Sequence, residues 1–245
     1  MSHMYYRQLF DYNKKLVEEI FDRADPGSLS RVVEFGAGSG LFTIPLLERI
    51  HDLVEEYIIF DPFPGPYRME KGTLKRRLRE AGFSDRITIR EKPIWKAHEE
   101  VDSIDLIIGH DVFCDLSMKQ IKDTLRSCKG VLGDGGVLVH SGLSATATTK
   151  GERLLIKLDG CSYRSVIKGH WFSPGSEFLY AISREVGFSI VNVHEVKIPL
   201  KLQGKTAMSL IKEWNIREDA LKKYEKEINE TGIEFPREQI LVCRM

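Results

Sequence analysis

One short stretch, R-V-V-E-F-G-A-G-S-G-L-F-T at residues 31–43, constrains the fold of this chain more than any other. Residues 31–35 are apolar and β-branched at their centre, which predicts a short strand. Three alternating glycines follow, and then apolar residues at helical spacing. Glycine is needed where a backbone turns sharply or lies against a ligand, and the helix N-terminus offers free N–H groups. A strand, a glycine loop and a helix in this order predict a nucleotide-type site.

The glycine spacing does not fit the dinucleotide fingerprint G-x-G-x-x-G. Counted from Gly36 or Gly38, the last glycine of that fingerprint is replaced by Leu41 or Thr43. The chain carries E-x-G-x-G-x-G instead, which resembles motif I of the class I S-adenosylmethionine (SAM) methyltransferases. In that family the glycine loop passes close to the methionine part of SAM. The resemblance therefore implies cofactor contacts by Glu34, Gly36, Ala37, Gly38 and Gly40. A glycine turn with only a packing role is the alternative.

Composition excludes several classes of protein. The chain has 245 residues, 42% of them hydrophobic, enough for a sizeable core in one α/β domain. Lys+Arg and Asp+Glu are both 36, so the chain lacks the basic excess typical of nucleic-acid binding. No apolar run approaches the ~20 residues of a membrane span, and no signal peptide is visible. The 4 cysteines are scattered, which favours reduced thiols in a cytoplasm.

An acidic residue supports the cofactor site. Residues 57–60 predict a second strand, and Asp61 follows at its end. In nucleotide folds, an acid about 20 residues past the glycine loop binds the ribose hydroxyls. Asp61 occupies this place after Gly40, and Pro62 is assigned to the same site. Asp61-Pro62-Phe63 superficially resembles the D-P-P-Y type motif of amino-methylating enzymes, but that motif belongs after the fourth strand.

The resemblance continues in register to residue 140. Residues 87–89 predict a third strand, and in the family the segment after it contacts adenine, which makes Ile94 and Trp95 candidates. Residues 104–109 predict a fourth strand buried on both faces. Its exit H-D-V-F-C-D-L, the helix predicted at 118–132 and G-D-G-G-V-L-V-H at 133–140 resemble the matching segments of small-molecule methyltransferases. Residues 31–140 are thus the predicted SAM-binding core.

Two histidines are candidates for catalysis. Ligands of open α/β sheets bind beyond the carboxyl ends of the strands, and His110 and His140 stand at such ends. Either could be a general base near the methyl group, because histidine titrates close to neutral pH. Alternatively, His110 only contacts the cofactor and His140 only packs. We predict no metal site, since a catechol-type site needs several oxygen ligands and only Asp111 is in a suggestive place.

Segments outside the core are predicted to bind the acceptor. Residues 5–25 read as an amphipathic helix, which in the family often lies over the cofactor or substrate. Residues 141–172 and 205–230 are longer than minimal connections and are predicted to form a cap. The candidate substrate contacts are Tyr5, Tyr6, Tyr12, His170, Trp171, Phe172 and Trp214. Packing alone is the alternative for the tyrosines. Basic residues such as Arg153 and Lys157 could meet an anionic group.

These features predict a single domain over residues 1–245 with a Rossmann-like α/β fold. The family implies a seven-stranded, mostly parallel sheet in the order 3-2-1-4-5-7-6 with the last strand antiparallel. The ending W…Y…F-P-R-x-x-I-L-V resembles trans-aconitate-type methyltransferases. The predicted reaction is SN2 methyl transfer from SAM to a small organic molecule, which leaves S-adenosylhomocysteine. The alternatives are a methyltransferase acting on RNA or protein, and a SAM-binding protein without catalysis. The acceptor atom and the oligomeric state do not follow from the sequence.

Overall fold

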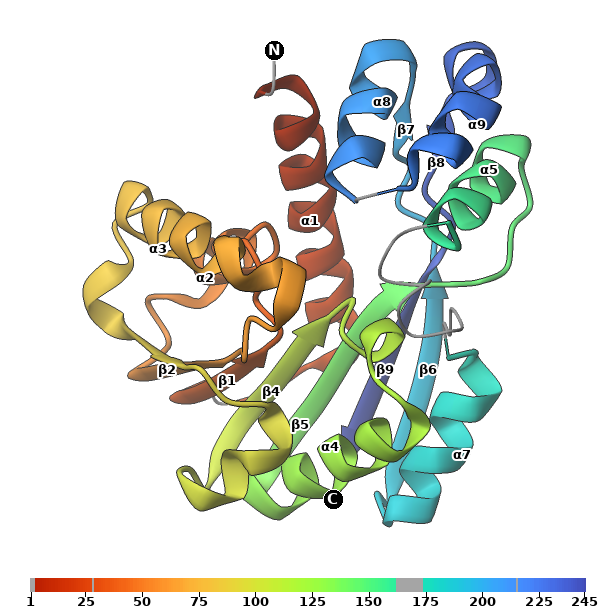
Figure 1. The fold of residues 1–245 in the computed structure, drawn as a ribbon. Coiled ribbons are helices and arrows are strands. Elements are labelled where there is room, and N and C mark those ends of the chain that lie inside the picture. The colour runs from red at the N-terminus through yellow and green to blue at the C-terminus, as the bar shows by residue number, and fades with distance from the viewer. Residues whose placement is uncertain (1–2, 28, 162–173, 215) are drawn as a thin grey trace.

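Seven strands form one central sheet in the order β3-β2-β1-β4-β5-β9-β6 (Figure 1), in a computed structural model that describes residues 3–27, 29–161, 174–214 and 216–245. In chain order the strands are β1 (Arg31–Phe35), β2 (Glu56–Phe60), β3 (Ile87–Arg90), β4 (Ile104–His110), β5 (Leu132–Leu143), β6 (Ile190–Val196) and β9 (Glu238–Arg244). The first five pair in parallel, and β9 runs antiparallel to β5 and β6. This confirms the predicted strand order.

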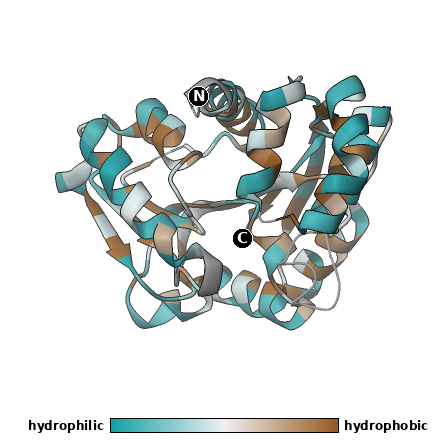
Figure 2. Cartoon of the chain, turned by 45° about the horizontal axis from the view of Figure 1, so that its top comes forward, coloured by the Kyte–Doolittle hydropathy of each residue, from teal (hydrophilic) through white to brown (hydrophobic). Residues whose placement is uncertain are grey.

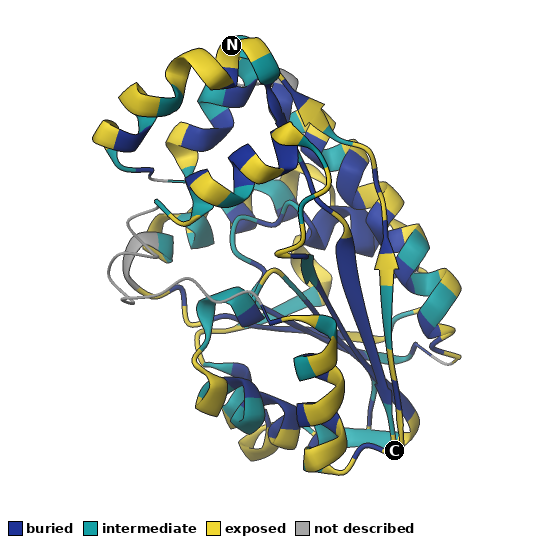
Figure 3. Ribbon diagram, turned by 90° about the vertical axis from the view of Figure 1, so that its right-hand side faces the viewer, coloured by how far each residue is buried: buried dark blue, intermediate teal, exposed yellow. Residues whose placement is uncertain are grey.

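Helices cover both faces of the sheet. On one face lie α1 (His3–Ala24), α2 (Thr43–Ile50) and α3 (Glu70–Glu80). On the other lie α4 (Met118–Val131), α7 (Ser176–Val186) and the short 3₁₀ turn Ile94–Glu99. Alternate residues of the strands fill two separate cores. The central strands are coloured mostly as hydrophobic in Figure 2 and mostly as buried in Figure 3. The inner strands are apolar on both faces because helices cover both.

Local hydrogen bonds decide where several elements begin and end. A capping box between Ser117 and Gln120 starts α4. Gly187 ends α7 in the left-handed conformation at φ 97°. The next strand begins at Ile190, and between the two the Phe188 carbonyl accepts a hydrogen bond from Arg184 Nη1 at 2.9 Å.

A group of small elements stands beyond the carboxyl ends of β4 and β5, at the top right of Figure 1. It contains α5 (Lys150–Asp159), α8 (Gly204–Glu213) and α9 (Glu218–Thr231). It also contains a two-stranded antiparallel ribbon of β7 (Lys201–Leu202) and β8 (Ile233–Glu234), which was not predicted from the sequence. Strands of two residues are too short to show periodicity. We call these five elements the cap.

The cap joins the two segments predicted to form it. Helix α5, from the segment 141–172, packs against β8 and α9, and α8 packs against α9. An ion pair between Lys197 and the buried Glu152 carboxylate ties α5 to the chain that leads into β7. None of the helices in the described ranges is both long enough and apolar enough to cross a membrane.

Gly109 of β4 provides a test of the packing beneath the site. A Cβ at this position would lie 2.4 Å from Cε2 of the buried Phe35 ring on the neighbouring strand. We expect Gly109→Val to lower the free energy of unfolding by about 1–3 kcal/mol, because overpacking forces side chains and backbone to shift. Urea denaturation measures the change.

Gly130 provides the matched control for this variant. It lies in α4, where an added Cβ would meet nothing within 4 Å outside its own helix. Gly130→Ala should leave the stability unchanged or raise it slightly, because alanine favours helix. Equal stability of the two variants would show that the β1–β4 contact tolerates a side chain.

Candidate functional site

The glycine loop lies at the carboxyl end of β1 and needs its glycines for two reasons. Gly36, Gly38 and Gly40 adopt φ values of 71°, 51° and 84°, a region that side chains disfavour. Side chains would also collide, because a Cβ on Gly36 would lie 2.2 Å from Val112 Cγ2, and one on Gly40 2.7 Å from Leu74 Cδ1. Ala37 is buried between them, and its carbonyl accepts a hydrogen bond from the Gly40 N–H at 2.9 Å.

Glu34 supports this loop from inside the core. Its side chain is only 1% exposed, and its two oxygens accept hydrogen bonds from Thr43 Oγ1 at 2.9 Å and from the Tyr57 hydroxyl at 2.6 Å. Burial raises the pKa of Glu34 to about 7, although the two hydroxyl donors oppose the shift. Glu34 thus links β1, β2 and α2. This geometry favours a supporting role over the direct cofactor contact that motif I implied.

Asp61 connects the end of β2 to the glycine loop. Its Oδ2 accepts a hydrogen bond from the Gly38 N–H at 2.8 Å, and its Oδ1 one from the Phe63 N–H at 2.8 Å. Burial raises the pKa of Asp61, and these two donors oppose the rise. A carboxylate oxygen has a second lone pair, so each oxygen can still accept from a hydroxyl group. Pro62 beside it is exposed.

The predicted adenine contacts lie at the carboxyl end of β3. Ile94 is buried in the core on the α4 side of the sheet, and Trp95 is half-buried against the same core. Of the two, Trp95 keeps the more accessible surface. Its contact with adenine stays a prediction.

A contact that was not predicted from the sequence holds the outer side of the glycine loop. Arg77 of α3 donates from Nη1 to both the carbonyl and the Oγ of Ser39 at 2.7 Å. Its guanidinium also lies 5.1 Å from the ring centre of Tyr6. No sequence pattern signals this contact, because Arg77 stands in a charge run that reads as a solvated helix face.

Tyr5 and Tyr6 join α1 to the cap. Both hydroxyls donate to the carboxylate of Glu213 at the end of α8, that of Tyr6 at 3.1 and 3.0 Å to its two oxygens. The chain Ser39–Arg77–Tyr6–Glu213 therefore connects the glycine loop, α3, α1 and the cap. A role of the two tyrosines in substrate binding stays a prediction.

The two candidate histidines lie on opposite faces of the sheet. His110 is in register with Ser141, so Gly109 and not His110 is the neighbour of His140. Side chains alternate between faces, which puts the His110 ring against Phe42 at 4.9 Å. Its Nδ1 lies 3.0 Å from Ser141 Oγ and its Nε2 3.5 Å from Asp111 Oδ2.

His140 is placed as a core residue. Its ring stacks on Phe113 at 3.7 Å, and its Nε2 accepts a hydrogen bond from the Phe113 N–H at 3.2 Å. Burial holds the pKa of His140 well below its usual range. A neutral, 4% exposed ring whose acceptor nitrogen is already engaged cannot readily take a proton from a substrate. The geometry therefore favours the packing alternative for His140, and His110 is the better placed base.

The remaining predicted substrate residues divide into two groups. The Tyr12 hydroxyl donates to the buried Glu238 at 2.6 Å, and its ring packs edge-on against Phe235 at 5.1 Å. Trp214 is half-buried, 6.3 Å from the same Phe235 ring. His170, Trp171 and Phe172 lie outside the described residues. Arg153 and Lys157 are exposed on α5.

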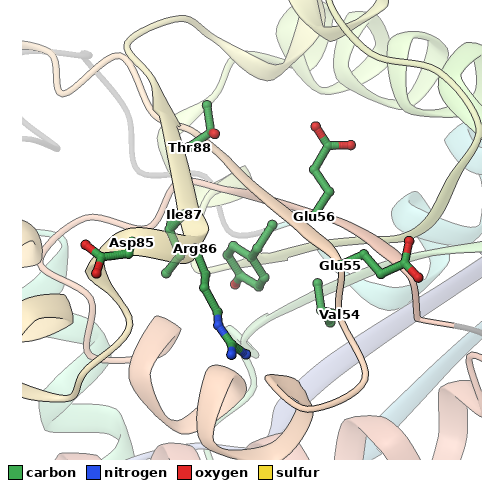
Figure 4. Close-up of a pocket in the computed structure, with 8 residues that line it drawn as sticks. Val54, Glu55, Glu56, Asp85, Arg86, Ile87 and Thr88 are labelled. Atoms are coloured by element: carbon green, nitrogen blue, oxygen red, sulfur yellow. The ribbon is translucent and has the colours of Figure 1, made fainter.

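Metal-binding groups and pockets were the remaining candidates for a site in the described residues. In the part of the chain that the structure describes, no three or more His, Cys, Asp or Glu side chains are grouped to hold a metal ion. A pocket of about 400 Å³ lies between residues 54–57 and 85–88 (Figure 4), at the amino ends of β2 and β3. Ligands of this fold bind at the opposite edge, so we do not assign this pocket to the cofactor.

The loop at the carboxyl edge fits SAM, the cofactor that the sequence motif implies. The three glycines leave the loop backbone without side chains, and Asp61 keeps acceptor capacity for the ribose hydroxyls. Helix α2 begins at Thr43 with no side-chain cap, and the Ile44 N–H in its first turn donates to the Gly40 carbonyl of the loop at 3.2 Å.

Comparisons with known proteins agree with this assignment. Residues 33–138 match the family model for a methyltransferase domain. The chain is also 31% identical over 118 residues to a highly reducing polyketide synthase from Penicillium polonicum. That match covers 48% of this chain and 4% of the synthase, so the chain spans a small part of the length of this relative.

Solved structures show the same fold at low sequence identity. The chain resembles a cyclopropane-fatty-acyl-phospholipid synthase-like protein from Lactobacillus casei with a TM-score of 0.68 and 12% identity, covering 98% of this chain and 92% of the other. The YcgJ protein from Bacillus subtilis matches with a TM-score of 0.66 and 15% identity, covering 93% of this chain and 97% of that chain. A SAM-dependent methyltransferase from Archaeoglobus fulgidus matches with a TM-score of 0.57 and 15% identity, covering 95% of this chain and 94% of that chain. The resemblance to trans-aconitate-type enzymes stays a prediction.

Replacement of Asp61 tests the cofactor site. We expect Asp61→Ala to weaken SAM binding by about ten- to a hundredfold, since a hydrogen bond to a charged group contributes about 1.5–3 kcal/mol. Titration calorimetry measures the affinity, and circular dichroism checks that the chain still folds. Asp134→Ala, an exposed aspartate at the other edge of the sheet, is the control. SAM affinity equal to that of the unmodified chain would contradict the assignment.

The pKa of Glu34 predicts how stability depends on pH. Between its ordinary value of 4.5 and about 7, the folded chain binds a proton at Glu34 that the unfolded chain does not. Stability therefore falls as pH rises through this window, by at most about 3 kcal/mol from this group. Glu34→Gln cannot titrate and should lose this part of the slope in urea denaturation at pH 4.5 to 7.5. The exposed control Glu55→Gln should keep it, and equal slopes in both variants would refute the buried-acid model.

Proposed function

We propose that this chain, a member of the class I SAM-dependent methyltransferases, transfers the methyl group of SAM to a small organic molecule held between the sheet edge and the cap. Methyl transfer follows from the family and the fold. The proposal adds the class of acceptor, and the position of the cap is the observation that supports a small molecule.

The position of the cap supports a small acceptor over a polymer. Helices α5, α8 and α9 stand beyond the carboxyl ends of β4 and β5, the edge that also carries the glycine loop (Figure 1). The hydrogen bonds of Tyr5 and Tyr6 with Glu213 close the side between α1 and α8. A nucleic acid or an extended protein needs an open groove, and a nucleic acid also favours a basic surface. Zero net charge and a covered edge both favour a small acceptor.

The residues of the chain supply orientation and a proton acceptor. The sulfonium of bound SAM is a good leaving group, so most of the acceleration comes from alignment and exclusion of water. We infer that His110 takes a proton from the acceptor. Its ring is half-buried against Phe42, and the Asp111 carboxylate lies 3.5 Å from its Nε2.

A two-step experiment tests this function. Titration calorimetry with SAM first establishes cofactor binding. The chain is then incubated with SAM carrying a deuterated methyl group and one of three fractions: small metabolites, RNA or protein. We expect a mass-shifted product in the metabolite fraction alone. At limiting SAM, Asp61→Ala should reduce the amount of this product by about tenfold or more.

The outcomes separate the proposal from its alternatives. Label in RNA or in protein with none in metabolites would assign the chain to polymer modification. SAM binding without label in any fraction would favour a SAM-binding protein without catalysis. Absence of SAM binding would overturn the cofactor assignment itself.

A further inference from the structure

Three polar side chains share one sheet face at the edge where the acceptor is proposed to bind. His110 of β4 is in register with Ser141 of β5, and Leu143 of β5 is in register with Glu238 of β9. Because residues two apart point to the same side, Glu238 faces the same way as His110 and Ser141, under α1. His110 and Glu238 lie two strands apart, about 10 Å across the sheet.

Glu238 is a buried acid that lacks a full set of partners. Its exposure is 0%, and its Oε1 accepts the hydrogen bond from the Tyr12 hydroxyl at 2.6 Å. Its Oε2 is also buried and has no hydrogen-bond partner among the residues that the structure describes. Buried polar atoms are nearly always paired, so this carboxyl oxygen calls for a partner that the described side chains do not supply.

A second carboxyl group lies on the same side of the site. Asp111 directly follows His110 in the left-handed conformation, φ 54°, and its Oδ1 accepts a hydrogen bond from the Leu143 N–H at 3.2 Å. Leu143 is the register partner of Glu238. Burial, with the nearby Asp111 charge, raises the pKa of Glu238 well above its usual range. An incoming cation would relieve both effects.

Two basic residues close to Glu238 are engaged elsewhere: Arg237, which precedes it, and Lys197, which follows its register partner Val196. Lys197 pairs with Glu152 and donates to the Phe235 carbonyl at 2.6 Å. Arg237, next to Glu238, pairs with Glu195 at 3.9 Å. Within the described ranges, neither Lys nor Arg forms an ion pair with Glu238 or Asp111. In the described part of the chain, the basic partner of Asp111 is His110, 3.5 Å from its Oδ2, and Glu238 has no basic partner.

Aromatic rings pack next to Tyr12, the hydrogen-bond partner of Glu238. Tyr12 packs edge-on against Phe235, and Trp214 lies 6.3 Å from Phe235. Aromatic faces attract cations, so rings and carboxyl groups favour the same kind of ligand.

We propose that Glu238, with Tyr12 and Asp111, binds an amino group of the acceptor, so that the substrate is a small amine-bearing molecule. The amino group is a recognition element and is separate from the proton acceptor His110. This inference rests on the proposed function. It differs from the sequence-based expectation that basic residues such as Arg153 and Lys157 meet an anionic group of the acceptor.

Three probes of similar shape test the charge preference. Benzylamine, benzyl alcohol and benzoate are titrated into the chain saturated with S-adenosylhomocysteine, and dissociation constants are measured by NMR. We expect benzylamine to bind about tenfold or more tightly than benzyl alcohol, and benzoate most weakly, because a charge-assisted hydrogen bond is the distinguishing contact. Equal affinities, tighter benzoate, or no binding by any probe would overturn the inference.

Variants locate the preference at Glu238. Glu238→Gln should reduce the ratio between amine and alcohol to about threefold or less, and Tyr12→Phe, which keeps the ring and the carboxyl group, should reduce it partly. Glu195→Gln, on the neighbouring strand β6, should leave it unchanged. Thermal melting and S-adenosylhomocysteine affinity show whether each variant is folded.

Two results distinguish the inference from the function beneath it. A full preference retained in folded Glu238→Gln would overturn the amine subsite while leaving methyl transfer intact. Loss of S-adenosylhomocysteine binding by the unmodified chain would overturn the methyltransferase assignment and the subsite with it.

Discussion

A carboxyl group without access to water holds the cofactor region together. Glu34 brings the strand that enters the glycine loop, the neighbouring strand and the following helix into one hydrogen-bonded unit through Tyr57 and Thr43. Burial of an acid is costly unless donors satisfy it, and here two hydroxyls do so. The loop between these elements can then keep three residues with positive φ in a fixed arrangement. Asp61 completes the unit by binding the Gly38 N–H from the end of the next strand.

The parallel register decides which polar residues can act together. Strands β1, β2 and β4 end at one edge, so the glycine loop, Asp61 and His110 gather there although they are far apart in the chain. The two-residue alternation then sorts them by face. His110 lies against Phe42 on the face of the sheet that α1 covers, whereas His140 stacks on Phe113 on the other face. Proximity in sequence to a strand end is therefore not enough to make a catalytic residue.

Much of the core could be predicted because local chemistry dictates it. The glycine spacing, the acid after the second strand and the continuous apolar strands indicated the family, and the family implied the strand order. The contacts of Arg77, Glu213 and Glu238 could not be predicted, because each meets a partner more than 35 residues away, as Arg77 does with Ser39. A buried glutamate also reads like a surface glutamate when only the sequence is known. The β7–β8 ribbon escaped prediction because two residues carry no pattern.

That ribbon has a consequence for how such a chain can diversify. The pairing of Lys201 with Glu234 and of Leu202 with Ile233 brings together the two ends of the segment that contains α8 and α9. A segment whose ends already meet can gain or lose residues at a small cost in loop entropy, since that cost grows only slowly with length. The seven strands of the central sheet all lie outside this segment, so their pairing does not depend on its length. The cap can therefore change in size while the sheet keeps its architecture.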